Sequence, residues 1–242
     1  MGALSKTVVV IPCYNEEGRL AIEDLLSFAA RAEVELLFVD DGSTDRTGAV
    51  LDELASRGDG RIHVHRLPRN HGKGAAVQAG MSEAMSWGPD VVGYLDADLS
   101  TPTEEFERLL AVRRRTDADV VLGSRVGLIG YDVRRSAVRH YLGRLFATAA
   151  SLVLSIQIYD TQCGAKVFRA SGALEQALAT PFRTRWVFDV ELLARIRAAD
   201  PAVHLLEVPL RRWCDVRGSK LSLRQMLLAA RDLLLLTRSG CG

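Results

Sequence analysis

Short apolar runs and longer amphipathic segments alternate along the first half of the chain. The first run, residues 7–12 (TVVVIP), is apolar and β-branched throughout, which predicts a strand buried on both faces of a parallel sheet. Similar runs predict strands over 34–39, 61–65, 90–95 and 119–122. The amphipathic segments between them predict helices over 20–32, 45–57 (with Ser43 or Thr44 as its N-cap), 74–87 and 103–115. Strands that alternate with helices predict an α/β fold with a mainly parallel central sheet flanked by helices.

The second half of the chain is less regular. Its pattern predicts one long helix over 136–156, a strand over 166–169 and a helix over 189–198. A strand over 203–213 contains Pro209, which favours an edge position or a bulge. An amphipathic helix is expected over 222–237, whose apolar face either packs on the core or lies at a membrane. No repeat or linker divides the sequence, so we expect a single domain over 1–242.

Composition narrows the class of protein. The 242 residues are 48% hydrophobic and 25% charged, which is typical of a globular protein that buries a sizeable core. A net charge of +1 argues against a dedicated nucleic-acid binder. The four cysteines stand at no metal-ligand spacing, and we find no signal-peptide pattern, so a reduced, cytoplasmic setting is expected. We find no apolar run of the roughly 20 residues that span a bilayer.

The near-neutral total conceals an uneven distribution of charge. Residues 1–107 have a net charge of −10, whereas residues 108–144 and 211–242 have net charges of +6 and +5. Acidic residues therefore dominate the first part of the chain, and two basic blocks follow.

Carboxylates follow three of the expected strands. Glu16 comes after the first strand, Asp40 and Asp41 after the second, and Asp96 and Asp98 after the fourth. Each cluster alone has a simpler explanation as a turn or helix cap. The carboxyl ends of parallel strands meet at one edge of the sheet, so the clusters would lie close together there. Carboxylates at such a distance repel one another unless a cation or hydrogen-bond donors compensate their charge. Mg²⁺ or Mn²⁺ held by Asp96 and Asp98, together with substrate phosphates, fits this need. Asp40 or Asp41 would then bind a base or ribose.

Residues 70–74 (NHGKG) precede a helix, so their backbone N–H groups and Lys73 would approach a phosphate group. The spacing is not that of a P-loop. These features together predict a site for a nucleotide diphosphate and a divalent metal ion.

The polar segments in their order resemble the inverting family-2 glycosyltransferases with a Rossmann-like GT-A fold. The segments are PCYNEE (12–17), DDGSTD (40–45), NHGKG (70–74), DAD (96–98), GSR (123–125), DTQCGAK (160–166), WVFDVE (186–191), EVP (207–209) and RGSKL (217–221). The later segments are similar to those of the polyprenyl-phosphate sugar synthases, in particular dolichyl-phosphate glucosyltransferases and mannose synthases. The resemblance spans roughly residues 7–225.

The resemblance implies a metal-dependent transfer, with inversion, of a hexose or N-acetylhexosamine from a nucleotide diphosphate sugar to a polyprenyl phosphate, as in glycan or cell-wall biosynthesis. Residues 1–107 would serve the nucleotide sugar and the metal, and residues 108–242 the acceptor. It also implies a peripheral location at the cytoplasmic face of a membrane, directly or through a separate membrane subunit. The sequence leaves the oligomeric state open.

Residue roles follow from the matched motifs. The implied catalytic residues are Asp160, Asp98 and Arg125. The implied nucleotide-sugar ligands are Pro12, Tyr14, Glu16, Asp40, Asp41, Lys73, Asp96 and Ala97. Cations for the acceptor phosphate are expected at Arg125, Arg134, Arg135, Arg139, Arg217 and Lys220, because arginine binds phosphate in a bidentate manner. Supporting positions are Gln162, Lys166, Asp189 and Glu191.

Two details of the sequence bear on the substrates. Ser100 stands where mannose synthases usually have a glutamine, and DTQCGAK is closer to the glucosyltransferases, so a UDP-sugar is favoured over GDP-mannose. An alternative acceptor is a soluble hydroxyl compound or growing glycan, for which Asp160 would act as general base. A nucleotide-sugar-binding module without catalysis is a third reading, disfavoured by the intact DAD and DTQ segments.

Overall fold

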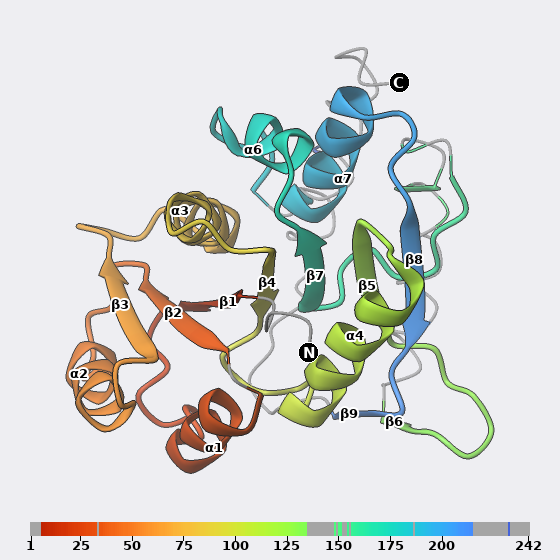
Figure 1. The fold of residues 1–242 in the computed structure, drawn as a ribbon. Coiled ribbons are helices and arrows are strands. Elements are labelled where there is room, and N and C mark those ends of the chain that lie inside the picture. The colour runs from red at the N-terminus through yellow and green to blue at the C-terminus, as the bar shows by residue number, and fades with distance from the viewer. Residues whose placement is uncertain are drawn as a thin grey trace.

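The computed structural model describes residues 6–32, 34–134, 148, 150, 151, 154, 156–185, 187–214 and 232. A seven-stranded sheet in the order β3-β2-β1-β4-β7-β5-β8 runs through its centre (Figure 1). Its strands, in chain order, are β1 (Thr7–Cys13), β2 (Glu35–Asp40), β3 (Ile62–Arg66), β4 (Val91–Leu95), β5 (Val120–Ser124), β7 (Ala165–Arg169) and β8 (Leu205–Pro209). A small parallel sheet pairs β6 (Asp132–Arg134) with β9 (Arg212–Cys214). The helices are α1 (Ile22–Ala32), α2 (Thr47–Arg57), α3 (Lys73–Ser86), α4 (Thr103–Thr116), α6 (Gly172–Leu178) and α7 (Phe188–Ala199).

The large sheet is parallel except at β7, which runs antiparallel to both β4 and β5. In the β4–β7 register, Leu95 at the end of β4 lies opposite Ala165 at the start of β7. The residues just after β4 therefore meet the residues just before β7. A mainly parallel sheet flanked by helices confirms the expected fold class, whereas the single domain stays a prediction.

Helices cover both faces of the large sheet (Figure 1). Val8 and Val10 of β1 pack in one apolar cluster with residues of α3, α6 and α7. Val9 and Ile11 point to the other face, where they pack with residues of α1, α2 and α4. Because alternate residues of β1 are buried on opposite faces, the strand has no polar side and reads as a continuous apolar run.

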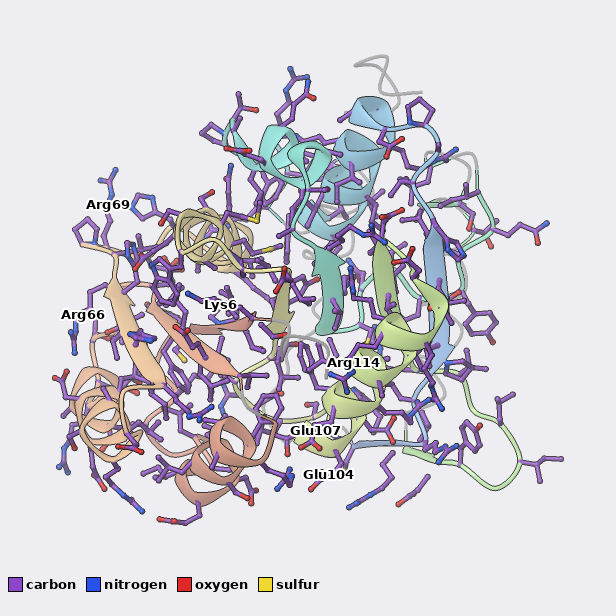
Figure 2. All side chains as sticks on the ribbon, viewed as in Figure 1. Lys6, Arg66, Arg69, Glu104, Glu107 and Arg114 are labelled. Atoms are coloured by element: carbon purple, nitrogen blue, oxygen red, sulfur yellow. The ribbon has the colours of Figure 1, made fainter. Side chains whose placement is uncertain are left out.

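Ion pairs link the outer helices to their neighbours at the surface. Arg31 Nη2 of α1 lies 2.7 Å from Glu107 Oε1 of α4, and Figure 2 labels Glu104 and Glu107 where α4 approaches α1. Arg66 Nη2 at the end of β3 lies 2.5 Å from Asp52 Oδ1 of α2. Partly exposed pairs of this kind contribute at most about 1 kcal/mol each to the stability of the fold.

The structure corrects several expected elements. The strand expected over 203–213 is two strands in different sheets, β8 and β9, and Pro209 ends β8 at the edge of the large sheet. Neither Ser43 nor Thr44 caps α2: the N-cap is Arg46, without a side-chain cap, and Asp45 Oδ1 accepts from the N–H of Thr47 at 2.9 Å. The sequence pattern also missed β6 and α6.

Two expected helices fall largely outside the described residues. Of the helix over 136–156, positions 148, 150, 151 and 154 are described and helical, and Ile156 lies at a bend. Of the helix over 222–237, only Asp232 is described, and it is helical and buried. Within the described ranges, no helix is both long and apolar enough to cross a lipid bilayer.

Candidate active site at the carboxyl ends of the strands

Hydrogen bonds join the loops that follow β1 and β2. Asn15 donates its backbone N–H to Ser43 Oγ at 3.0 Å, and its side-chain oxygen accepts from the N–H of Thr44 at 2.8 Å. The N–H of Glu16 donates to Thr47 Oγ1 at 2.8 Å. The PCYNEE and DDGSTD segments therefore form one connected structure, in which the polar residues of both motifs serve as mutual partners.

The pair Asp40–Asp41 is buried and engaged with backbone groups. Asp41 accepts from the N–H groups of His71 and Gly72 at 2.7 and 2.8 Å, and Asp40 accepts from the N–H of Ser43 at 2.9 Å. The two bonds to Asp41 hold the NHGKG loop against the end of β2, and the bond to Asp40 closes the DDGSTD turn. Contact of either carboxylate with a base or ribose stays a prediction.

Gly42 is required for the close approach of these two loops. Its φ of +66° lies in the left-handed region, and a Cβ there would stand 2.4 Å from the backbone carbon of Arg69. Only glycine fits such a position without a shift of the backbone. Gly42 thus allows the NHGKG loop to pack against the loop that follows β2.

Carboxylates from two loops converge around Asp96, the first residue after β4. Lys73 Nζ lies 2.5 Å from Asp96 Oδ1, and Asp98 Oδ1 accepts from the N–H of Ser100 at 3.0 Å. Burial raises the pKa of Glu16, Arg19 opposes this, and Asp98 and Asp96 add to the rise. Glu16, Asp96 and Asp98 are therefore near enough to one another to interact electrostatically, as the strand-end pattern predicts.

Gly164 makes room for the Asp96 side chain. A Cβ at Gly164 would lie 2.0 Å from Asp96 Oδ2, and the N–H of Asp96 donates to the carbonyl of Gly164 at 2.9 Å. The DTQCG and DAD segments are thus in direct contact, which follows from the β4–β7 register.

The chemistry of this cluster fits a divalent cation. Glu16 Oε2 is buried and lacks a hydrogen-bond partner among the described residues, whereas Asp96 Oδ1 is paired with the ammonium group of Lys73, which a metal ion would have to displace or share. The described residues contain no preformed group of three or more metal-ligating side chains. Mg²⁺ typically needs only one or two protein carboxylates when phosphates and water complete its shell. Asp96 with Asp98 meets that requirement.

Lys73 is held as a cation beside these carboxylates. The Lys73 side chain is 43% exposed; its partial desolvation lowers its pKa, but the nearby charges of Asp96, Asp189 and Asp98 outweigh this effect, and the net pKa is raised. The ammonium group therefore stays charged at neutral pH. It stands at the start of α3, where backbone N–H groups also favour an anion.

A buried ion pair lies beneath this cluster. Lys166 Nζ is 2.7 Å from Asp189 Oδ1, 2.7 Å from Tyr94 Oη and 2.6 Å from the carbonyl of Cys163. Tyr94 Oη also donates to Asp189 Oδ1. Burial and the neighbouring Asp189 raise the pKa of Tyr94 well above its usual value, so the phenol remains a donor. This network joins β4, β7 and α7 directly under the DAD and DTQCG segments.

Asp160 holds Arg125 in a two-point ion pair. Arg125 Nε donates to Asp160 Oδ2 at 2.6 Å, Nη2 donates to Oδ1 at 2.8 Å, and the backbone N–H of Arg125 adds a third bond at 3.0 Å. Burial lowers the pKa of Arg125 and Asp160 raises it, and the result is a pKa well above the ordinary value. The guanidinium group also lies over the buried Trp213 ring, 5.4 Å from its centroid.

Glu207 positions Asp160 from the edge strand β8. Its two carboxylate oxygens accept from the N–H groups of Tyr159 and Asp160 at 2.8 and 2.6 Å. The EVP segment contains this glutamate, but the sequence pattern indicated no role for it or for Tyr94. The signal for Glu207 was a charged residue inside an otherwise apolar strand.

Glu191 organises the loop before α7. It accepts from the N–H groups of Arg183 and Thr184 at 3.0 and 2.9 Å, and from Arg195 Nη2 at 2.6 Å. In the same loop the N–H of Arg185 donates to Asp232 Oδ2 at 3.2 Å. Asp189 and Glu191 thus have separate hydrogen-bond partners. Among the described residues, neither side chain shares a partner with Asp98.

The remaining expected site residues vary in their surroundings. Ala97 is buried, Pro12 is half-buried and Tyr14 is exposed. The N–H of Gln162 donates to Asp160 Oδ1 at 3.2 Å. The expected phosphate-binding cations that lie outside the described residues are Arg135, Arg139, Arg217 and Lys220, and the side chain of Arg134 is also not described.

The sequence of this chain is similar to those of known glycosyltransferases. The family model described as Glycosyl transferase family 2 matches residues 8–175. A dolichyl-phosphate beta-glucosyltransferase of Trichomonas vaginalis is 31% identical over 241 residues, covering 94% of this chain and 69% of that protein. A polyprenol monophosphomannose synthase of Mycolicibacterium smegmatis is 33% identical over 206 residues, covering 85% of this chain and 76% of that protein.

A solved structure shares the fold. The glucosyl-3-phosphoglycerate synthase of Mycobacterium tuberculosis, crystallised with Mn²⁺, uridine diphosphate and glucosyl-3-phosphoglycerate, has a TM-score of 0.66 and 21% sequence identity. The match covers 98% of this chain and 80% of that one. At this level of identity the similarity concerns the fold.

Proposed function

Because this chain belongs to glycosyl transferase family 2, we propose that it transfers a hexose or N-acetylhexosamine from a nucleotide diphosphate sugar to a polyprenyl phosphate. The donor is a UDP-sugar, the cofactor is Mg²⁺ or Mn²⁺, and the enzyme works peripherally at the cytoplasmic face of a membrane. The observation that best supports a phosphate acceptor is the two-point pair of Asp160 with Arg125, on the loop that contacts Asp96 through Gly164.

Asp160 in this geometry is an orienting group. Both of its carboxylate oxygens accept hydrogen bonds from Arg125, which leaves it poorly placed to remove a proton from an acceptor. A phosphate monoester needs no such base, because its second pKa is about 6 and it is already anionic at neutral pH. It needs fixed hydrogen-bond donors, and the guanidinium group of Arg125, oriented by Asp160, provides them, although the pair as a whole carries no net charge.

The donor diphosphate would be received between the NHGKG loop and the DAD carboxylates. Lys73 provides a charged donor, and the start of α3 provides backbone N–H groups. Asp96 and Asp98 are the residues that would hold the metal ion. When bound, the metal ion neutralises negative charge on the leaving diphosphate. The Lys166–Asp189 pair beneath fixes the strand ends that present these groups.

A transfer assay with purified protein tests the activity. Radiolabelled UDP-glucose, a UDP-N-acetylhexosamine and GDP-mannose are each offered with a short prenyl phosphate and Mg²⁺ or Mn²⁺. We expect lipid-linked product from a UDP-sugar, loss of product in EDTA, and loss of turnover in Asp98→Ala. Unchanged turnover in that variant would contradict the metal assignment.

A soluble acceptor is the competing possibility, and the same assay separates it. Product with a hydroxyl acceptor but none with prenyl phosphate would favour that alternative. Absence of product with every acceptor, alongside measurable UDP binding, would indicate a binding module without catalysis.

A further inference from the structure

The loop between β5 and β6 exposes apolar side chains to solvent. Ile129 is 105% exposed, Leu128 is 43% exposed and Tyr131 is 36% exposed, and we call these three residues the apolar tip. Tyr14 is the one other large apolar residue among those described that is exposed to this extent. Isolated exposed apolar residues are common, whereas three within four positions on one loop indicate a surface that binds something.

The backbone of the loop keeps the apolar tip away from the rest of the protein. The N–H of Tyr131 donates to the carbonyl of Leu128 at 3.1 Å, which closes a turn across the tip. Gly130 has a φ of +86°, and a Cβ at Gly127 or Gly130 would meet no atom within 4 Å. The apolar side chains therefore project outward from an ordered turn.

Both ends of the loop are fixed next to the candidate acceptor site. The loop starts at Arg125, which is paired with Asp160, and ends in β6, where the N–H of Asp132 donates to the carbonyl of Arg211 at 2.8 Å. Arg211 and Arg212 are exposed beside this base, and Asp132 is the acidic residue among them. Figure 1 shows the loop projecting from the end of the molecule where β8 and β9 meet, opposite α6.

We propose that the apolar tip inserts into the interfacial region of a lipid bilayer and thereby brings Arg125 to the headgroup level. Apolar side chains at the outermost point with arginines behind them match the polarity profile of a membrane surface, and the excess positive charge at the base favours anionic lipid. The part of this inference that concerns the acceptor rests on the proposed function, since a polyprenyl phosphate presents its phosphate at that level.

Vesicle binding tests the insertion directly. Wild-type protein, Ile129→Glu and Gln176→Glu are sedimented with vesicles of phosphatidylcholine and phosphatidylglycerol. Gln176→Glu is the matched control, because it adds the same charge at an exposed position on α6. Burial of one large aliphatic side chain corresponds to about a tenfold change or more in binding, so we expect at least that loss in Ile129→Glu and none in the control.

A reporter at the same position gives a second measurement that does not depend on loss of binding. Ile129→Trp should show a blue shift of its additional fluorescence when vesicles are added. Failure of the wild type to bind vesicles, equal binding by wild type and Ile129→Glu, or an unshifted tryptophan would each overturn the inference. A change of sedimentation coefficient in Ile129→Glu without a change in vesicle binding would assign the tip to self-association instead, and would also overturn it.

Activity with two forms of acceptor separates this inference from the proposed function. Ile129→Glu should lose transfer to a long prenyl phosphate in vesicles and retain transfer to a short, water-soluble prenyl phosphate. Loss of both to the same extent would contradict a role in membrane access. If the wild type transfers sugar to neither acceptor yet binds vesicles through Ile129, the proposed function fails while membrane insertion stands.

Discussion

Removal of the Lys166 charge is the most direct test of the network beneath the site. In Lys166→Met, Asp189 keeps Tyr94 as a hydrogen-bond donor but loses the ammonium group 2.7 Å away. Lys166 is 1% exposed and Asp189 is 5% exposed, so water does not replace the lost partner without rearrangement. Loss of one member of such a buried pair typically costs about 3–5 kcal/mol of folding free energy.

Guanidinium denaturation followed by circular dichroism measures this cost. A loss of that size should lower the unfolding midpoint by about 1 M, given the usual dependence of stability on denaturant. Arg66→Met is the matched control, because it removes a cation from the partly exposed pair with Asp52 and should cost at most about 1 kcal/mol.

A double variant distinguishes the lost charge from lost packing. Lys166→Met with Asp189→Leu removes both charges and should be more stable than the sum of its single variants predicts, because an apolar pair can replace a buried ion pair. The recovery should be partial, because Tyr94 Oη and the Cys163 carbonyl lose their partners in this variant. A midpoint for Lys166→Met equal to that of Arg66→Met would refute the reasoning. So would a double variant as unstable as the sum of its two single variants.

Three further predictions concern the site. Gly164→Ala would place a Cβ 2.0 Å from Asp96 Oδ2 and so displace this carboxylate. Mn²⁺ binding, measured by calorimetry, should weaken by about tenfold or more while the fold remains. Unchanged Mn²⁺ affinity would contradict the close approach of Gly164 to Asp96. Asp160→Asn removes the charge that orients Arg125. The KM for prenyl phosphate should therefore rise about tenfold, with a smaller effect on kcat. Complete loss of kcat without a change in KM would instead indicate that Asp160 transfers a proton. Burial and Asp160 raise the pKa of Cys163 to about 11, so its thiol stays protonated at mildly alkaline pH. Mass spectrometry after iodoacetamide treatment should find the exposed Cys214 alkylated before the buried Cys163, and the reverse order would contradict this prediction.

The sequence predicted the first half of the fold well for a physical reason. Strands covered on both faces consist mainly of apolar residues, and β1 and β4 were therefore distinct from the helices that follow them. The elements β6 and α6 have only three and seven residues, too few for the alternation of apolar and polar positions to distinguish a strand or helix from a loop. The two strands β8 and β9 looked like one because the two residues between them include the buried Leu210.

The candidate site was predictable where a motif stands at a strand end and less so where partners come from distant segments. The carboxylates after β1, β2 and β4 followed from the rule that ligands bind at the carboxyl ends of parallel strands. The bond of Asp41 to the N–H of Gly72 depends on the approach of two loops, and the link from Lys166 to Tyr94 depends on the register of an antiparallel pair. Local pattern contains no information about either.

The antiparallel insertion of β7 between β4 and β5 has a consequence for divergence among related enzymes. Because ladder hydrogen bonds fix Ala165 opposite Leu95, the position of the DTQCG loop beside Asp96 does not depend on the length of the chain between β5 and β7. Insertions and deletions in that intervening stretch would leave the segments around Asp96 undisturbed. Under the proposed function, exchange of this stretch is therefore a route to a changed acceptor preference with an unchanged donor.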